Sequence, residues 1–441
     1  MKKYKSINLT KYIKSNRIKK LIRLLGERIC MEEKLKFGIG FVTGRANVCE
    51  IINNYYKAII EQVRKYTCKV DITIYILYDT TYQNCKKEEF YHILPEAHEQ
   101  IKIKYISPEA IEEEIVKVSN KNQIDKEKVS LFLGHGHAKA RNTVMYYAVK
   151  DKIDYLLFWD DDEYPVAIAK DNGRNVWIKQ ENILKHIEYM EKENADVTIG
   201  YHCGYISPIP WIEYNENFTE QDMKEFIEVI SNEIISWESI KDKMKNNNGV
   251  TYADLKKAKG IGAYEIESQG IGKWVSGSTL CLNLNHKDKI PAFYNPPLAR
   301  GEDTFFSTQL ANAKVFKIPV YHFHDGFLKY REIMEEKYPK CLRKISAKEQ
   351  CIDKRFLSAT SGWIKYKPLL LYISNQKNYK NEIEKMRKKL AGIIPKLNYV
   401  FENDAFSVLL EELEKYDRDV EKHYEDYKIT NDIWNILKNT L

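Results

Sequence analysis

The sequence predicts an α/β fold in which a mostly parallel central sheet is flanked by helices. Apolar runs of strand length alternate with stretches of helical periodicity through the first two thirds of the chain, as in βαβ units. Several of these runs end in polar or acidic residues, and ligands of such sheets bind beyond the carboxyl ends of the strands. With 441 residues and 44% hydrophobic content, the chain can form one large core and an appended part.

The composition of the chain argues against some classes of function. Lys and Arg number 70 against 63 Asp and Glu, so the net charge of +7 is diffuse and does not indicate nucleic acid. The excess suits a phosphate-bearing ligand or an anionic membrane surface equally well. The 8 cysteines show no Cys-x-x-Cys pair, which indicates reduced thiols. Without a long apolar run or a signal-peptide pattern, we expect a cytoplasmic protein, with peripheral contact at the inner face of the membrane as a further expectation.

Residues 1–35 form the first predicted segment, a basic helix. Lys and Arg are interleaved with Leu and Ile at helical spacing. Such a helix can lie on a membrane surface, or it can dock on the body of the protein with its basic face in water. Both interpretations remain open.

Two strands are predicted at 37–42 and 70–77, with a helix at 47–66 between them. Polar residues follow each strand, namely Thr43 and Arg45 after the first and Asp79 after the second. Side chains at these positions can contact a nucleotide, although Thr and Asp are also ordinary loop residues. The glycines at 38 and 40 lack the spacing of a dinucleotide-binding turn, so we do not infer NAD binding.

A third strand at 101–106 and a helical stretch to about residue 128 precede a glycine-rich turn at 134–136. This turn opens a helix to residue 150 that carries Arg141, an arrangement that can hold a phosphate. The apolar run 156–159 then ends in the carboxylates of residues 160–163. Carboxylates packed this closely need a cation, and hard oxygen ligands suit Mg²⁺ or Mn²⁺. The alternative is a solvated acidic turn after a buried strand.

The remaining chain continues the α/β pattern and then becomes helical. We expect a helix at 180–194, strands at 195–201, 274–282 and 315–321, and a polar helical insertion at 211–270. Glu302 and Asp303 begin a predicted helix at 303–311, where Asp is commonly a cap. His322 and His324 follow the last strand and share one of its faces. Residues 328–441 show only helical pattern.

Taken in order, these motifs resemble the nucleotide-sugar-dependent glycosyltransferases of the GT-A fold, and most closely the inverting family 2 and its relatives. The Asp-x-Asp motif of that family matches residues 160–162, and its Ala-Arg-Asn element matches residues 140–142. Its glycine-containing loop resembles residues 276–278, its Glu-Asp motif matches residues 302 and 303, and its late histidine matches His322 or His324. Two features depart from the family, the sequence Asp-Thr-Thr at residues 79–81 and the insertion.

The resemblance implies a Rossmann-like GT-A domain at 36–327 with the insertion at 211–270, followed by a helical C-terminal region at 328–441. It implies transfer of a sugar, a hexose by expectation, from a UDP- or GDP-sugar to an acceptor hydroxyl with inversion, in bacterial-type glycan biosynthesis. A retaining transferase, a nucleotidyltransferase and a non-catalytic nucleotide-binding protein remain as alternatives.

The resemblance also assigns residues and partners. Asp303 is the expected general base, with Glu302 binding the acceptor or orienting the site. The expected cofactor is Mn²⁺ or Mg²⁺, acting as a Lewis acid on the leaving diphosphate. The acceptor is a glycan, a lipid-linked molecule or a protein, nucleic acid is not an expected partner, and the C-terminal helices can form a homo-oligomer. The expected metal ligands are Asp160, Asp162, His322 and His324, and the expected nucleotide-sugar contacts are Thr43, Arg45, Asp79, Arg141, Asp160, Asp161, Gly277 and Ser278.

Overall fold

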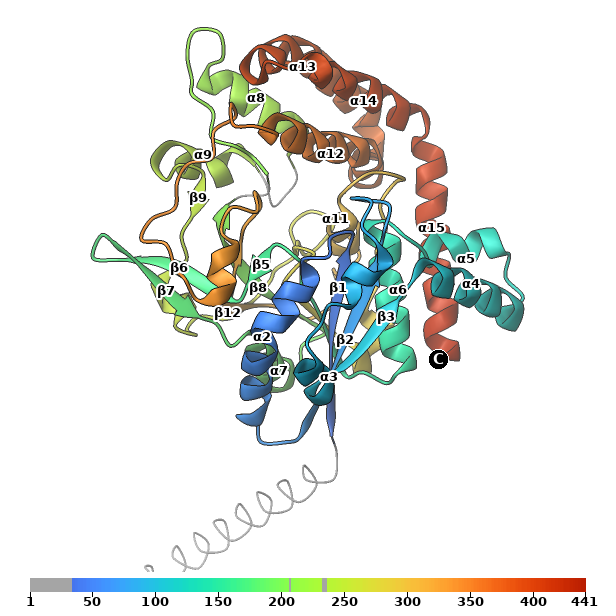
Figure 1. Ribbon diagram of the computed structural model, residues 1–441. Coiled ribbons are helices and arrows are strands. Elements are labelled where there is room, and N and C mark those ends of the chain that lie inside the picture. The colour runs from blue at the N-terminus through green and yellow to red at the C-terminus, as the bar shows by residue number, and fades with distance from the viewer. Residues whose placement is uncertain (1–33, 206–207, 232–235) are drawn as a thin grey trace, which may run out of the picture.

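The computed structural model describes residues 34–205, 208–231 and 236–441 (Figure 1). Residues 1–33 of the predicted basic helix therefore lie outside the described residues. A ten-stranded sheet forms the centre of the molecule, and β5 (Glu163–Tyr164) and β9 (Val250–Thr251) pair with its strands β12 and β8. The other strands lie in the order β10 (Tyr264–Glu265), β12 (Val315–His324), β8 (Val197–Tyr205), β11 (Leu280–Asn283), β4 (Tyr155–Phe158), β1 (Leu35–Thr43), β2 (Val70–Tyr78) and β3 (Lys102–Ile106).

Six strands of this sheet run in one direction. β3, β2, β1 and β4 are parallel neighbours, and β8 and β12 pair in parallel. β11 lies antiparallel between β4 and β8, so both halves of the sheet point the same way. The carboxyl ends of all six strands therefore meet at one edge of the sheet.

Helices cover both faces of the sheet. On one face, α2 (Val48–Arg64) and α7 (Asn182–Glu193) share a core with Phe37, Ile39 and Phe41 of β1, and α7 contacts β8 and β12. On the other face, Val144 and Met145 of α6 (His137–Lys150) pack with Leu156 and Phe158 of β4. The remaining helices that flank the sheet are α3 (Pro95–Gln100), α4 (Pro108–Asn122) and α5 (Lys126–Phe132). The predicted α/β fold class is confirmed.

The glycines of β1 are explained by packing. A Cβ added to Gly40 would lie 2.8 Å from Val144 Cγ1 and 3.2 Å from the Phe158 ring. A Cβ at Gly38 would lie 3.1 Å from side-chain atoms of both Ile153 and Leu156. Glycine in a strand often marks such a close approach, here of α6 and its neighbours to the sheet.

The insertion and the C-terminal region pack together as one unit, which we call the helical lobe. It consists of α8 (Glu220–Ile230), α9 (Trp237–Asn246), α12 (Ile352–Ser374), α13 (Tyr379–Phe401) and α14 (Val408–Arg418). Phe226 of α8 meets Phe356 of α12 edge to face, with ring centroids 5.9 Å apart. The lobe lies beyond the carboxyl ends of the strands, above the sheet in Figure 1.

The last helix returns to the sheet domain. α15 (Val420–Thr440) lies beside α5, where Trp434 stacks on Phe132 with centroids 5.5 Å apart (Figure 1). The Trp434 Nε1–H donates to the Ile290 carbonyl at 2.7 Å. The C-terminal helices are therefore fixed at two places, in the helical lobe and against α5.

Three details differ from the sequence-based expectations. Residues 328–351 contain a 3₁₀-helix (Arg331–Glu335) but no α-helix, because their apolar side chains pack into the sheet core, and the helical region begins at Ile352. The expected strand 274–282 is reduced to β11. A hairpin of β6 (Val166–Asp171) and β7 (Arg174–Lys179) was not expected. The insertion also contains α10 (Leu255–Ala258) besides the edge strands β9 and β10.

Candidate active site

The predicted site residues gather at the edge where the six parallel strands end. Thr43 ends β1, the Asp residues at 160–162 follow β4, and His324 ends β12. Gly277 and Ser278 precede β11, which begins at this edge because it runs in the opposite direction. Topology therefore brings together residues that are up to 281 positions apart.

Arg141 of α6 links three other segments of the site. Its Nη2 lies 3.1 Å from Asp160 Oδ1, its Nε donates to Glu302 Oε1 at 3.2 Å, and its Nη1 donates to the Gly277 carbonyl at 2.7 Å. The guanidinium carbon lies 4.9 Å from the centroid of the Phe158 ring, a cation–π distance. A Cβ on Gly277 would lie 3.0 Å from Arg141 Nη2, so the glycine permits this approach.

The three aspartates point to different partners. Asp160 has a side chain that is 40% exposed and can reach a ligand. Asp161 is buried and accepts hydrogen bonds from Thr43 Oγ1 and from Arg45, whose Nε lies 3.1 Å from Asp161 Oδ2. Asp161 therefore holds the loop after β1 against the Asp motif. Partial removal from water and repulsion from Glu163 and the other two aspartates raise the pKa of Asp160 above its ordinary value, against the attraction of Arg141.

Asp162 faces three basic side chains. Its Oδ2 lies 3.0 Å from Arg45 Nη2 and 3.7 Å from Nη2 of Arg355, and its Oδ1 lies 3.9 Å from His324 Nε2. Burial opposes ionisation, but Arg45 and His324 outweigh it and lower the pKa of Asp162. Arg355 belongs to α12, so the helical lobe contributes a cation to this site.

The pair of Asp162 and His324 fits a divalent cation. His324 Nδ1 lies 2.6 Å from the Tyr205 carbonyl, which can only accept, so Nδ1 carries a proton and Nε2 is the nitrogen that faces Asp162. Two such donors 3.9 Å apart can share an ion, since metal–ligand bonds are about 2.0–2.2 Å long. Nowhere in the described part of the chain do three or more His, Cys, Asp or Glu side chains form a metal cluster. Substrate oxygens and water would supply the other positions.

His322 has a different environment. It is fully buried, its Nδ1 lies 3.0 Å from Glu163 Oε2, and its Nε2 lies 2.9 Å from Asn182 Nδ2. Both ring nitrogens are thus engaged within the protein. Of the two predicted histidines, His324 is the one that keeps a nitrogen for an ion.

Glu163 organises a hydrogen-bonded group beneath the Asp motif. Ser278 Oγ donates to Glu163 Oε1 at 2.5 Å, and His202 Nε2 lies 2.8 Å from Ser278 Oγ and 3.0 Å from the same carboxylate oxygen. Burial opposes ionisation, but His202 and His322 outweigh it and lower the pKa of Glu163 well below its ordinary value. Ser278 is therefore held in place from two sides.

Glu302 and Asp303 differ in ionisation. Burial opposes the ionisation of Glu302, yet Arg141 outweighs it and lowers the pKa of this carboxyl. Burial raises the pKa of Asp303 to about 6, with repulsion from Glu302 adding to the effect. Such a value suits a group that takes up a proton near neutral pH.

Backbone N–H groups hold the Asp303 carboxylate in place. Asp303 Oδ2 accepts from the Gly277 N–H at 3.0 Å, and its Oδ1 accepts from the Thr304 N–H at 2.8 Å. The residue lies in the first turn of α11 (Glu302–Ser307), whose N-cap position is occupied by Gly301. Asp303 is thus not the cap residue that the sequence pattern suggested.

Asp79 lies at the same edge, after β2. Its N–H donates to the Thr43 carbonyl at 2.9 Å, and its Oδ1 accepts from the Thr81 N–H at 2.8 Å and from Thr81 Oγ1 at 2.6 Å. Among the described residues, Asp79 thus forms hydrogen bonds with the loop after β1 and with Thr81, not with the Asp motif.

The sequence identified most of these residues but missed others. Arg355, Glu163, His202 and Tyr205 contribute to the site and were not predicted. Glu163 continues the run of carboxylates, so its position was visible. Arg355 and His202 lie in segments without a recognisable motif.

No protein family and no curated protein matches this sequence. Among solved structures, the chain is similar to the apo form of mouse xyloside xylosyltransferase 1, with 10% sequence identity and a TM-score of 0.22. The match covers 64% of this chain and 74% of that chain.

Proposed function

We propose that the protein is a metal-dependent glycosyltransferase that moves a sugar from a UDP- or GDP-sugar to an acceptor hydroxyl with inversion. The observation that carries the proposal is the arrangement at the strand ends. Asp162 and His324 face each other beside Arg45 and Arg355, while Asp303 is held by Gly277 near Arg141. Guanidinium groups can stabilise a diphosphate, and a carboxylate of raised pKa can act as a general base, so both features support the proposal.

In this proposal Asp162 and His324 hold the Mn²⁺ or Mg²⁺ ion, with Asp160 as a further ligand. The bound ion supplies Lewis acidity toward the leaving diphosphate. Arg45 and Arg355 lie next to Asp162, so their guanidinium groups can neutralise phosphate charge that grows as the bond to the sugar breaks. Thr43, Asp79 and the backbone of the loop after β1 contact the nucleoside.

Asp303 accepts the proton of the acceptor hydroxyl as that oxygen attacks the sugar. Glu302 fixes Arg141, which is also bonded to Gly277 and Asp160. The carbonyl and N–H of Gly277 therefore position Arg141 and Asp303 relative to each other. Direct attack opposite the leaving group inverts the anomeric centre.

Incubation with a panel of UDP-, GDP- and CMP-sugars in the presence of Mn²⁺ tests the proposal. The measurement is free nucleotide over time, with and without glycan, lipid-linked and peptide acceptors. Release of UDP or GDP that depends on Asp162 supports transfer, and the product anomer, read by NMR, distinguishes inversion from retention. A parallel incubation with nucleoside triphosphates and sugar 1-phosphates tests the alternative, since release of pyrophosphate from the triphosphate would identify a nucleotidyltransferase. Tight nucleotide binding without any release would identify a non-catalytic nucleotide-binding protein.

A further inference from the structure

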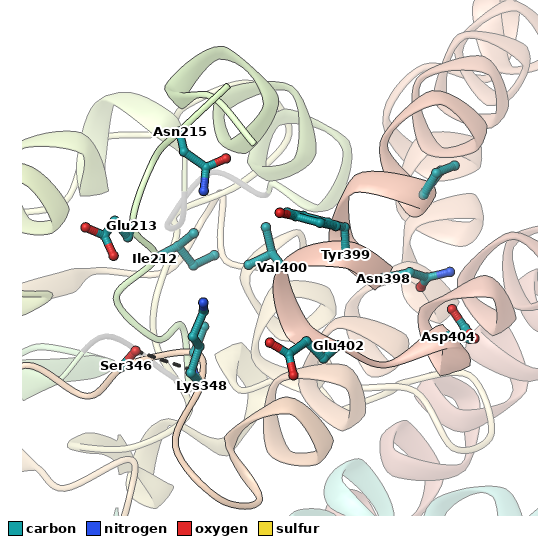
Figure 2. A pocket seen from close by; sticks show the side chains of 12 residues that line it. Ile212, Glu213, Asn215, Ser346, Lys348, Asn398, Tyr399, Val400, Glu402 and Asp404 are labelled. Carbon is teal, nitrogen blue, oxygen red and sulfur yellow. Dashed lines mark hydrogen bonds between the residues drawn. The ribbon is translucent and has the colours of Figure 1, made fainter. Parts of the chain in front are cut away.

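The helical lobe contains a cavity of about 610 Å³. Three segments line it, the insertion residues 212–215, the loop 346–348, and the end of α13 with the residues that follow it (Figure 2). The volume falls in the range of about 300–1,000 Å³ that small-molecule sites occupy. None of the residues assigned above to the candidate active site lines this cavity.

One wall of the cavity is aromatic. Tyr399 is 58% exposed, and its ring faces the gap between the insertion and α13 in Figure 2. The Asn217 amide donates to the Tyr399 hydroxyl at 3.1 Å and holds the ring in position. A large aromatic side chain exposed in a cavity offers a flat apolar surface, and the negative face of its ring attracts partly positive C–H groups.

The polar lining supplies both acceptors and donors. Glu213 and Glu402 offer carboxylate oxygens, Asn215 offers an amide, and Lys348 offers an ammonium group. The Asn398 amide nitrogen is engaged by Ser407 Oγ at 3.2 Å, and its Oδ1 is shielded from solvent. Carboxylate and amide oxygens accept hydrogen bonds from hydroxyl groups, and an ammonium group donates to them.

The charges of the lining exclude one class of ligand. The carboxylates of Glu213, Glu402 and Asp404 outnumber the ammonium group of Lys348, so the lining repels a phosphate or another anion. A neutral ligand that both donates and accepts hydrogen bonds meets all of these groups. Sugars combine hydroxyl groups of both kinds with C–H faces that suit Tyr399.

The cavity is connected to the candidate active site by one turn of helix. Asn403, between the lining residues Glu402 and Asp404, donates to Asp353 Oδ2 at 2.8 Å. Arg355 follows Asp353 by two positions in α12, and its Nη2 lies 3.7 Å from Asp162 Oδ2. The first turn of α12 therefore contacts the cavity wall on one side and the Asp motif on the other.

We infer that this cavity is a second carbohydrate subsite, which binds a neutral oligosaccharide. The inference rests on the proposed function, because it assigns the cavity to the acceptor glycan at sugar units remote from the reacting hydroxyl. It narrows the acceptor to molecules that carry several neutral sugar units. Lipid-linked and protein-linked glycans both meet this condition.

The test uses the full-length chain and an array of neutral tri- to hexasaccharides, with the bound sugars then titrated by calorimetry. Tyr399→Ala should weaken binding by at least about tenfold, since it removes the aromatic wall. Tyr399→Trp should preserve binding. Tyr264→Ala serves as a matched control, because Tyr264 is similarly exposed, at 51%, on the edge strand β10. Should Tyr399→Ala melt at a lower temperature, Glu213→Gln on the opposite wall provides a second variant.

Binding is read without catalysis, so the outcome is independent of whether a nucleotide is released. With an active enzyme, Tyr399→Ala should raise KM for long acceptors and leave kcat and the KM of a monosaccharide acceptor unchanged. Absence of oligosaccharide binding at millimolar concentration, or equal binding by wild type and the folded variants, would overturn the inference. Displacement of the sugar by a lysine-rich peptide at low salt would reassign the cavity to a basic protein segment.

Discussion

At the scale of single residues, Asp303 has the most specific predicted role. We expect Asp303→Asn to reduce transfer by about 10²–10⁴, the usual effect of losing a general base. Asn keeps one acceptor oxygen for the N–H groups of Gly277 and Thr304, so the free energy of unfolding should fall by only about 1 kcal/mol. Calorimetry should show unchanged donor binding. Turnover near the wild-type rate would place the base elsewhere.

The pH dependence of the reaction should report the same carboxyl. Because the pKa of Asp303 is raised to about 6, kcat/KM should rise with pH and level off above that value. The effect on stability has the opposite sign, since the folded state holds the proton more tightly than the unfolded chain, whose Asp pKa is about 3.9. This contribution to stability is complete below about pH 4 and is lost as pH rises through about 6. Asp303→Asn should abolish both dependences, measured by pH–rate profiles and by urea unfolding.

Substitutions of the two histidines at the end of β12 should have different effects. His324→Ala should weaken Mn²⁺-dependent nucleotide binding at least about tenfold, whereas thermal stability should change little. His322→Ala leaves Glu163 and Asn182 short of a buried partner, so it should lower the free energy of unfolding by about 1–3 kcal/mol. Calorimetry with Mn²⁺ and with EDTA, together with thermal melts, separates the effects. Metal-dependent binding that survives His324→Ala would remove this residue from the site.

At the scale of elements, the contact of α6 with β1 can be tested with two glycines. Gly40→Ala places a methyl group 2.8 Å from Val144, and such overpacking costs about 1–3 kcal/mol. Gly392 of α13 has nothing within 4 Å of an added Cβ, so Gly392→Ala should stabilise the protein by about 0.5–1 kcal/mol. Urea unfolding measures both changes. Equal effects of the two substitutions would contradict the packing explanation of Gly40.

Sequence patterns predicted this sheet edge well for a physical reason. Buried parallel strands are apolar runs that stop abruptly, so Thr43, Asp79 and the Asp motif were visible as strand ends. The environments of His322 and His324 were not predictable. The alternation of side chains along a strand shows which face of the sheet a residue occupies, but not which residues of other segments it contacts there. The β6–β7 hairpin had a signal in Asn172-Gly173, both at positive φ, which is the favoured turn pair for a hairpin.

At the scale of the whole molecule, α15 ties the C-terminal region to the sheet domain. Trp434→Ala removes a fully buried ring that stacks on Phe132, so it should lower the free energy of unfolding by about 3–5 kcal/mol. Because the same helix follows the helical lobe in the chain, we expect one cooperative transition in the wild type. Calorimetric melting measures the loss of stability in Trp434→Ala and the number of transitions in the wild type. Two separate transitions in the wild type would show that the lobe and the sheet domain unfold independently.

Sequence patterns do not show that the insertion packs against the C-terminal helices. Each segment has an ordinary amphipathic pattern, which shows that a face is buried but not against what. Phe226 and Phe356 lie 130 positions apart in the chain and meet only in the folded lobe. The apolar faces of the lobe helices pack with one another. None of the helices in the described part of the chain is long and apolar enough to cross a membrane.

The position of Arg355 affects when the protein can first work during its synthesis. A ribosome produces the chain from the N-terminus at about 5–20 residues per second, and domains fold as they emerge. The Asp motif is complete after residue 162, but the cation that α12 brings to it lies almost 200 residues later, and α12 packs with α13 and α14, which follow it. Asp162 therefore gains its third basic partner only after residue 355 and the helices that pack with α12 have left the ribosome. On the proposed function, a nascent chain would bind a nucleotide sugar only at this late stage.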